Sequence, residues 1–179
     1  MRKLAYGVAT SLDGFIAGPN GEYDWITPDS GIEFGRIYAK YDTLLMGRRT
    51  YDVAKTRPGL LHDTGMEIVV VSTTLAPAAH PNLTILASRV PEAIAAFKTR
   101  PGKDIWLMGG GVLFRSLLDS GLVDAVEVSV FPVLLGAGTP LLPQGRRIAL
   151  HLESSAALPS GVLMLSYAVA AAPDSARAD

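Results

Sequence analysis

Three segments of the chain each combine an apolar run with residue types that bind phosphate. Residues 44–51 (LLMGRRTY), 68–74 (IVVVSTT) and 105–111 (IWLMGGG) end in glycines, hydroxyls or guanidinium groups. The first and third lead directly into helix-like sequence, and helix N-termini bind anions. A glycine at the end of a strand is, on its own, most often a turn residue. Three such segments in one chain predict a site for the phosphates of a dinucleotide.

Alternating strand-like and helix-like segments over the first two thirds of the chain would position these loops. The expected strands cover residues 3–10, 43–46, 67–71, 83–86 and 104–108. The expected helices run from Asp29 or Ser30 to Lys40, from Arg49 to Lys55, from Pro91 to just before Pro101, and from Gly111 to Ser120. The run at 67–71, which is apolar from Ile68 onward, is typical of a strand that is covered on both faces of its sheet.

The last third of the chain has a different pattern. Apolar and polar residues alternate over 126–131, and residues 148–154 and 162–169 also read as extended, with only turn-like residues between them. Strands joined in this way pair antiparallel. We therefore expect an α/β domain over residues 1–170, with a mostly parallel sheet, flanking helices and antiparallel C-terminal strands. Residues 171–179 are small and polar, and we expect a partly disordered tail there.

The composition argues against several classes of function. The 179-residue chain has a net charge of −1 and no block of basic residues, so nucleic-acid binding is not expected. It has no cysteine, which excludes disulfides and thiolate metal sites. His62, His80 and His151 have no other ligand residue at metal-binding spacing, so no metal is predicted. No apolar run is long enough to cross a membrane, and a cytoplasmic protein is expected.

Several ordered motifs make the chain resemble the dihydrofolate reductase-like superfamily. Residues 11–14 (SLDG), 24–27 (DWIT), 122–124 (LVD) and 132–136 (PVLLG) are similar to the reductase domain of bacterial riboflavin deaminase-reductases and its stand-alone relatives. Residues 46–51 and 108–111 look more like dihydrofolate reductase itself. The resemblance covers residues 3–170 and implies a three-layer dihydrofolate reductase-like fold.

The resemblance also implies NADPH as the cofactor, lying across the carboxyl edge of the sheet. By this similarity the diphosphate lies over the glycine triplet, and an arginine with two hydroxyls holds the ribose 2′-phosphate, where an NAD site would have an acidic residue. The implied cofactor residues are Gly47, Arg48, Arg49, Thr50, Ser72, Thr73, Gly109, Gly110, Gly111 and Val112.

Candidates for the substrate side are less closely matched. Asp13 could hydrogen-bond an amino-pyrimidine or pterin-like ring, although an Asp-Gly turn is the alternative. Asp29 and Glu33 are the candidates for proton delivery, in a stretch only loosely similar to the folate carboxylate motif. Trp25 could stack near the nicotinamide or could simply pack a loop onto the core. Gly136 could line the substrate site or belong to an ordinary loop.

The expected function is an NADPH-dependent reductase of a small pterin- or pyrimidine-like heterocycle. Riboflavin reductases typically carry a basic residue after the Leu-Asp-Gly motif, and this chain has Phe15 there, which argues against a phosphoribosylated substrate. Two alternatives stay open: a dinucleotide-binding module without turnover, and a true dihydrofolate reductase. A homodimer is expected, because related reductases form dimers and an apolar C-terminal hairpin needs covering.

Overall fold

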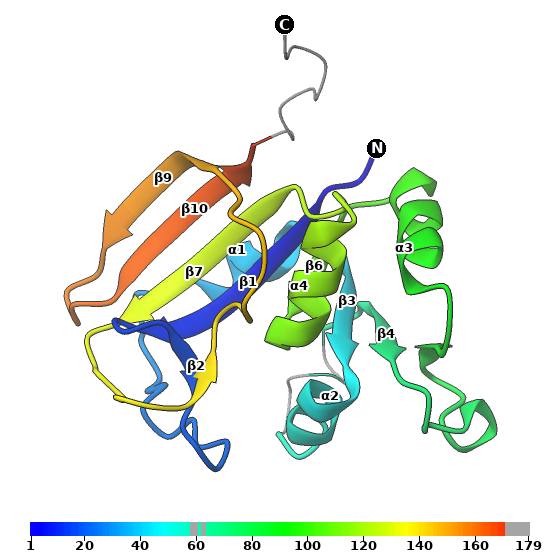
Figure 1. The fold of residues 1–179 in the computed structure, drawn as a ribbon, viewed down its shortest axis with the longest axis horizontal. Helices are drawn as coiled ribbons and strands as arrows, with labels where there is room; N and C mark the ends of the chain where they lie inside the picture. Colours follow the sequence, from blue (N-terminus) through cyan, green and yellow to red (C-terminus); the bar gives the residue numbers. More distant parts are fainter. Residues whose placement is uncertain (58–60, 62–63, 171–179) are drawn as a thin grey trace, which may run out of the picture.

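The computed structural model describes residues 1–57, 61 and 64–170 of the chain. An eight-stranded sheet forms its centre (Figure 1). Its strands are β1 (Leu4–Ser11), β3 (Tyr41–Gly47), β4 (Glu67–Val71), β5 (Thr84–Leu86), β6 (Asp104–Met108), β7 (Ala125–Phe131), β9 (Leu150–Ala157) and β10 (Leu163–Val169). The helices are α1 (Phe34–Ala39), α2 (Arg48–Ala54), α3 (Val90–Thr99) and α4 (Gly111–Asp119), with a 3₁₀ turn at Pro77–Ala79.

The sheet is parallel except at one end, as the sequence predicts. The strand order is β5-β4-β3-β6-β1-β7-β10-β9. Every pair from β5 to β7 is parallel, whereas β10 pairs antiparallel with both β7 and β9. Because parallel strands place their carboxyl ends at one edge, the loops after β1, β3, β4 and β6 gather there. This gathering brings the three segments that were predicted to bind phosphate to the same edge of the sheet.

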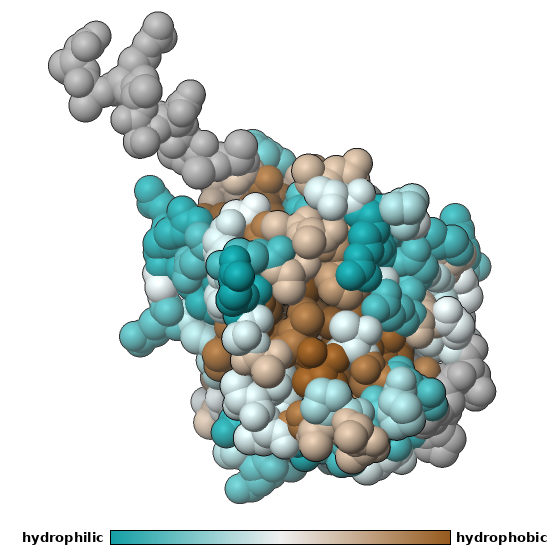
Figure 2. Space-filling model, turned by 90° about the vertical axis from the view of Figure 1, so that its right-hand side faces the viewer, coloured by the Kyte–Doolittle hydropathy of each residue, from teal (hydrophilic) through white to brown (hydrophobic). Residues whose placement is uncertain are grey.

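Helices lie on both faces of the sheet, so the expected α/β fold with antiparallel C-terminal strands is confirmed. On one face, Ile94 and Phe97 of α3 and Phe114 and Leu117 of α4 pack into a buried apolar cluster with β1, β6 and β7. On the other face, Tyr51 and Ala54 of α2 are buried against β3 and β4, and α1 packs more loosely, with no buried residue of its own. Figure 2 shows a surface on which apolar residues gather at the centre and hydrophilic residues lie around them.

Helix α1 is shorter than the sequence predicts, beginning at Phe34 instead of Asp29 or Ser30. The expected capping carboxylate is used elsewhere, because Asp29 accepts hydrogen bonds from the Gly31 backbone N–H and from the Ser160 hydroxyl. Glu33 takes the cap position without a side-chain hydrogen bond to the helix. A short helix that buries nothing leaves part of this sheet face uncovered.

A second, two-stranded sheet was not predicted. It pairs β2 (Phe15–Ala17) with β8 (Thr139–Pro140), and joins the turn after β1 to the loop after β7. The two chains approach so closely at Gly138 that a Cβ there would overlap the carbonyl oxygen of Ala17. The predicted tail, 171–179, lies outside the described residues.

Candidate functional site

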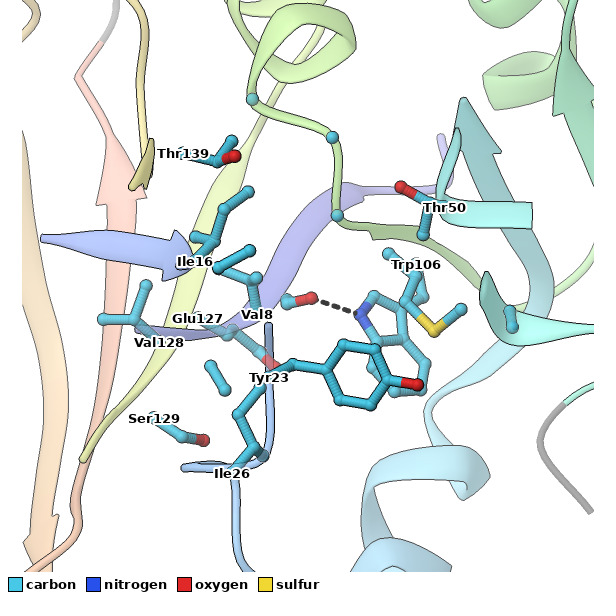
Figure 3. A pocket seen from close by; sticks show the side chains of 18 of the residues that line it. Val8, Ile16, Tyr23, Ile26, Thr50, Trp106, Glu127, Val128, Ser129 and Thr139 are labelled. Carbon is cyan, nitrogen blue, oxygen red and sulfur yellow. Dashed lines mark hydrogen bonds between the residues drawn. The ribbon is translucent and has the colours of Figure 1, made fainter. Parts of the chain in front are cut away.

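A cleft of about 1730 Å³ opens at the carboxyl edge of the parallel strands. Its lining comes from β1, β6 and β7, from the glycine loop before α4, from the start of α2 and from the 19–29 loop. Figure 3 shows Thr50 and Trp106 on one side of this pocket and Ile16 and Thr139, from the small β2–β8 sheet, on the other. The central sheet and the helices on both of its faces therefore contribute to one cavity.

The glycine triplet after β6 forms one wall of the cleft. Gly109 and Gly110 have φ angles of 70° and 87°, a region that favours glycine. Gly111 begins α4, and a Cβ there would lie 3.0 Å from the carbonyl oxygen of Pro140. The N-cap residue Gly110 has no side chain to cap α4, and Gly111, Val112 and Leu113 of its first turn line the cleft. Val112, in the same helical turn, is 78% exposed and lines the cleft.

Thr50 and the two arginines stand across from the glycines. Thr50 Oγ1 lies 3.5 Å from the position that a Cβ on Gly110 would occupy, so α2 and the glycine loop face each other. Gly47, Arg48 and Arg49 line the cleft beside Thr50. A ring of backbone donors, one hydroxyl and two guanidinium groups suits the phosphates of a dinucleotide.

Arg48 is held in place by two further contacts. Its Nε donates to Asp52 at 2.6 Å, and its Nη1 reaches the Thr74 hydroxyl at 3.4 Å. Ser72 is buried and its Oγ accepts the backbone N–H groups of Thr74 and Leu75, both at 3.1 Å. Ser72 thus shapes the turn that presents Thr74, and the neighbouring Thr73 is exposed. Neither Ser72 nor Thr73 lines the main cleft, so their 2′-phosphate role stays a prediction.

The opposite end of the cleft has a floor of small residues. Strand register places Gly7 beside Glu127, Glu127 beside Ser166, and Ser166 beside Ser154 on one face of the sheet. The next row toward the strand ends contains Ala9, Ser129 and Met164, and both rows line the cleft. Because most of these side chains are short and α1 covers little of this face, the sheet itself forms the bottom of a chamber.

Trp106 forms an aromatic wall of this chamber. Its Nε1 donates to the carbonyl oxygen of Gly7 at 3.0 Å, a bond drawn in Figure 3. A Cβ at position 7 would overlap the indole, so glycine is required for the ring to lie across β1. Tyr41 stacks on Trp106 with a centroid distance of 5.7 Å, and Tyr38 lies 5.9 Å away. The chamber therefore has a flat apolar side.

Glu127 places a carboxylate in the chamber, and sequence reasoning missed it. Its Oε2 accepts the Tyr41 hydroxyl at 3.0 Å and its Oε1 lies 3.3 Å from Lys40 Nζ. Burial and the nearby Glu127 raise the pKa of Tyr41, so the phenol keeps its proton and remains a donor. The sequence did show a glutamate inside an otherwise apolar strand. Which residues lie beside this glutamate depends on the register of four strands, which the sequence does not reveal.

Asp13 lies outside the cleft lining, and its carboxylate binds protein groups. It accepts the Ser11 hydroxyl at 2.6 Å, the Gly136 N–H at 2.7 Å and the Leu135 N–H at 3.1 Å. These bonds, the Ser11 bond foremost, lower the pKa of Asp13. Both Asp13 and Gly136 thus join the turn after β1 to the loop after β7. Their predicted catalytic and substrate-binding roles stay predictions, and their contacts indicate that they brace these loops.

Asp29 lines the cleft, whereas Glu33 does not. The Ser160 hydroxyl and the Gly31 N–H lower the pKa of Asp29, which keeps it ionised near neutral pH. Glu33 is exposed and pairs with Arg36 at 2.7 Å. The structure therefore does not bring the three predicted carboxylates together, and proton delivery by any of them stays a prediction.

Trp25 packs on the core beside the cleft. Its ring meets Phe131 edge-on at 5.7 Å, and its buried Nε1 has no hydrogen-bond partner among the described residues. Trp25 does not line the cleft, so the structure favours the packing alternative over stacking on a ligand.

The described part of the chain has no cluster of side chains placed to bind a metal and no helix that could span a membrane. Residues 1–57 and 64–170 contain no group of three His, Asp or Glu side chains placed to hold a metal ion. His80 lies edge-on to Tyr51 and His151 is exposed on β9, while His62 lies outside the described residues. The helices within these residues are all too short or too polar to span a bilayer.

Comparison with known proteins agrees with this architecture. YyaP of Bacillus subtilis (strain 168), an uncharacterized protein, is 31% identical over 177 residues, covering 93% of this chain and 94% of YyaP. The riboflavin biosynthesis protein RibD of Corynebacterium ammoniagenes is 26% identical over 148 residues, which are 75% of this chain and 44% of RibD. The crystal structure of a pyrimidine reductase-like protein from Corynebacterium diphtheriae superposes with a TM-score of 0.75 at 15% identity, covering 96% and 93% of the two chains.

The family model of the RibD C-terminal domain matches residues 2–164. The match spans β1 to the start of β10 and includes the glycine loop, the start of α2 and the floor of the chamber. The chain therefore belongs to the RibD C-terminal domain family.

Proposed function

We propose that this protein is an NADPH-dependent reductase that transfers a hydride to a C=N or C=O bond of a small pterin- or pyrimidine-like heterocycle. Family membership supports a reductase of the riboflavin-biosynthesis type, and one relative of the same fold is called pyrimidine reductase-like. The observation that carries the proposal is the joining of two different ends in one cleft. One end has protein groups that can bind phosphate, and the other end is a chamber with a flat aromatic wall and a carboxylate.

The residues at the phosphate end fit a dinucleotide. Gly109 and Gly110 line the cleft with positive φ angles and have no side chain to keep a phosphate away from the backbone, and the first turn of α4, which no side chain caps, would add N–H donors. Thr50 and Arg49 would bind the diphosphate from the opposite side. Arg48, whose Nη1 lies 3.4 Å from the Thr74 hydroxyl, would hold a ribose 2′-phosphate together with Thr73 and Thr74. When bound, NADPH supplies the hydride, and the protein supplies position and electrostatics.

The chamber residues would orient the acceptor and exclude water. Trp106 gives a ring a flat surface on which to lie, and Ile16 and Val8 close the pocket with apolar side chains. Asp29 is the proposed residue of a proton path. Because its pKa is lowered, Asp29 would be ionised and would orient a water molecule that donates the proton to the substrate.

The test is NADPH oxidation by the purified protein over a panel of pterins, folates and aminouracils. Oxidation that depends on one class of heterocycle supports the proposal. Tight NADPH binding without oxidation of any panel member would instead support the dinucleotide-binding module. Efficient turnover of dihydrofolate alone would identify a true dihydrofolate reductase.

We also propose a cytoplasmic homodimer that binds neither nucleic acid nor membrane. Strand β9 is exposed along its whole length at the edge of the sheet, and Leu150 and Leu152 are among its exposed residues. An open edge strand is a template for pairing with another chain, which a second copy would satisfy. Sedimentation of the purified protein tests this, and a monomer at high concentration would contradict it.

A further inference from the structure

At the chamber end of the cleft, one carboxylate side chain could form hydrogen bonds to the edge of a heterocyclic ring. Glu127 lies at the centre of its row, between Gly7 and Ser166, and lines the cleft with 27% of its side chain exposed. The small neighbours leave space above the carboxylate. Figure 3 shows Glu127 in the same pocket as Trp106 and Ser129.

The protein uses only part of the hydrogen-bonding capacity of this carboxylate. A carboxylate offers about four acceptor positions, two on each oxygen. Lys40 approaches Oε1 and the Tyr41 hydroxyl donates to Oε2, so each oxygen has one protein partner. About one acceptor position on each oxygen therefore remains for a ligand. Two parallel N–H groups match two carboxylate oxygens, as they do in arginine–carboxylate pairs.

The charged side chains at the two ends of the cleft favour different ligand groups. Arg48 and Arg49 stand at the glycine-loop end, where the cofactor phosphates are proposed to lie. Arg57 also lines the cleft, and its guanidinium group lies over the Tyr23 ring, 4.1 Å from the ring centroid. At the chamber end Lys40 is already paired with Glu127. A phosphate group placed there would meet a carboxylate, and like charges repel. The chamber thus suits a ring without a phosphate.

We propose that Glu127 is the specificity-determining residue of the chamber, and that it binds the N–H edge of a planar, unphosphorylated amino-heterocycle. The edge consists of an amino group beside a ring nitrogen that carries a proton, while the ring face lies against Trp106. For the reaction itself this assignment rests on the proposed reductase function. Tyr41 and Lys40 act as positioning residues, because they orient the carboxylate without meeting the reacting atoms.

The test uses two probes that share one ring and differ at its edge. 2,4-Diaminopyrimidine offers the donor edge, and uracil places carbonyl oxygens at the same positions. Each is titrated calorimetrically into wild-type protein and into Glu127→Gln, with and without NADPH. Glu92→Gln, on the exposed surface of α3, is the matched control for loss of a carboxylate. Circular dichroism checks that each variant is folded.

The wild type should bind the diamino probe at least about tenfold more tightly than uracil, because the contact is charge-assisted. Glu127→Gln should remove most of this preference while NADPH affinity and the Glu92→Gln control stay unchanged. An equal affinity of wild-type protein for both probes overturns the assignment even if the variant does not fold. A preference that survives Glu127→Gln overturns it as well. Failure of NADPH to bind would count against the reductase function alone, because the titrations without cofactor test Glu127 separately.

Discussion

The two ends of the cleft are built from different parts of the polypeptide. At the glycine-loop end, the backbone N–H groups of 109–113 and the first turn of α4 do most of the proposed binding, supported by Arg48 and Arg49. At the chamber end, side chains from separate strands do so, with Glu127 on β7, Trp106 on β6 and Tyr41 on β3. A backbone site tolerates few changes of conformation, whereas a side-chain site can change its specificity by single substitutions.

The largest expected effect is at the glycine loop. Gly110→Val should weaken NADPH binding by at least about tenfold, since a branched side chain would disturb the left-handed backbone and stand between the loop and the diphosphate. Gly121→Val is the matched control, because Gly121 also has a positive φ, of 67°, and no neighbouring atoms within 4 Å of an added Cβ. Both variants should lose similar stability in thermal unfolding. If they bind NADPH equally well, the glycine loop is not part of the cofactor site.

The next effect separates NADPH from NADH. Arg48→Ala should reduce affinity for NADPH by about tenfold or more and leave affinity for NADH nearly unchanged, because a charge-assisted phosphate contact contributes at least about 1.5 kcal/mol. Lys55→Ala is the control, since Lys55 is the other cation that pairs with Asp52, at 2.6 Å. Equal losses for both dinucleotides in Arg48→Ala would refute the 2′-phosphate assignment, and Arg49→Ala would then be the variant to measure.

Two buried tyrosines on opposite faces of the sheet test whether the hydrogen bond to Glu127 in the chamber stabilises the protein. Tyr41 donates to Glu127, whereas the Tyr6 hydroxyl has no partner among the described residues and its ring stacks on Phe114 at 3.7 Å. Tyr41→Phe should lower the free energy of unfolding by about 1 kcal/mol. Tyr6→Phe should leave it unchanged or raise it, since the variant removes a buried hydroxyl without a bond. Urea unfolding measures both, and equal effects would contradict the distinction.

The same tyrosines predict a loss of stability at alkaline pH. Burial raises the pKa of both phenols above the ordinary value of 10.0, with Glu127 adding to the rise at Tyr41. Above that ordinary value the unfolded chain releases these protons while the folded chain retains them, so the free energy of unfolding falls as pH rises. The double variant Tyr6→Phe/Tyr41→Phe should show a shallower fall in urea unfolding above about pH 10. An unchanged slope would indicate that other groups control it.

The smallest effect concerns Asp13. If Asp13 braces the loops at 11–14 and 132–136, Asp13→Asn should reduce turnover by less than about tenfold and leave NADPH affinity unchanged, since the amide oxygen can still accept an N–H. Steady-state kinetics with the substrate found in the panel checks this. A fall in kcat of several orders of magnitude would instead restore Asp13 as a catalytic residue.

The parts of the molecule that sequence predicted are those in which neighbouring residues determine the outcome. The glycine loop, α4 and the strands before them are each specified within about ten residues by apolar runs, glycines and turn signals. The same local patterns located the antiparallel C-terminal strands. The cofactor end of the cleft was therefore accessible from sequence, although its ligand stays a proposal.

The chamber could not be predicted, because pairing between distant strands creates it. Glu127 was visible as a polar residue in the alternating pattern of β7, yet the sequence could not place Gly7 on one side of it and Ser166 on the other. The start of α1 was wrong for a related reason. Asp29 had the chemistry of a helix cap, but a hydroxyl 131 positions away, on Ser160, competes for its carboxylate.

The position of Trp106 gives the protein an internal optical probe of its own cleft. The chain contains two tryptophans, and Trp25 packs against Phe131 outside the cavity. In a Trp25→Phe variant, emission would come from an indole that lies over Gly7 and faces the chamber. A ligand that covers this ring would change its emission at once, so occupancy could be followed in real time without labels. Gly7 leaves room for the indole over β1. For the same reason, Gly7 would allow the fluorescence of Trp106 to distinguish the empty cavity from the filled one.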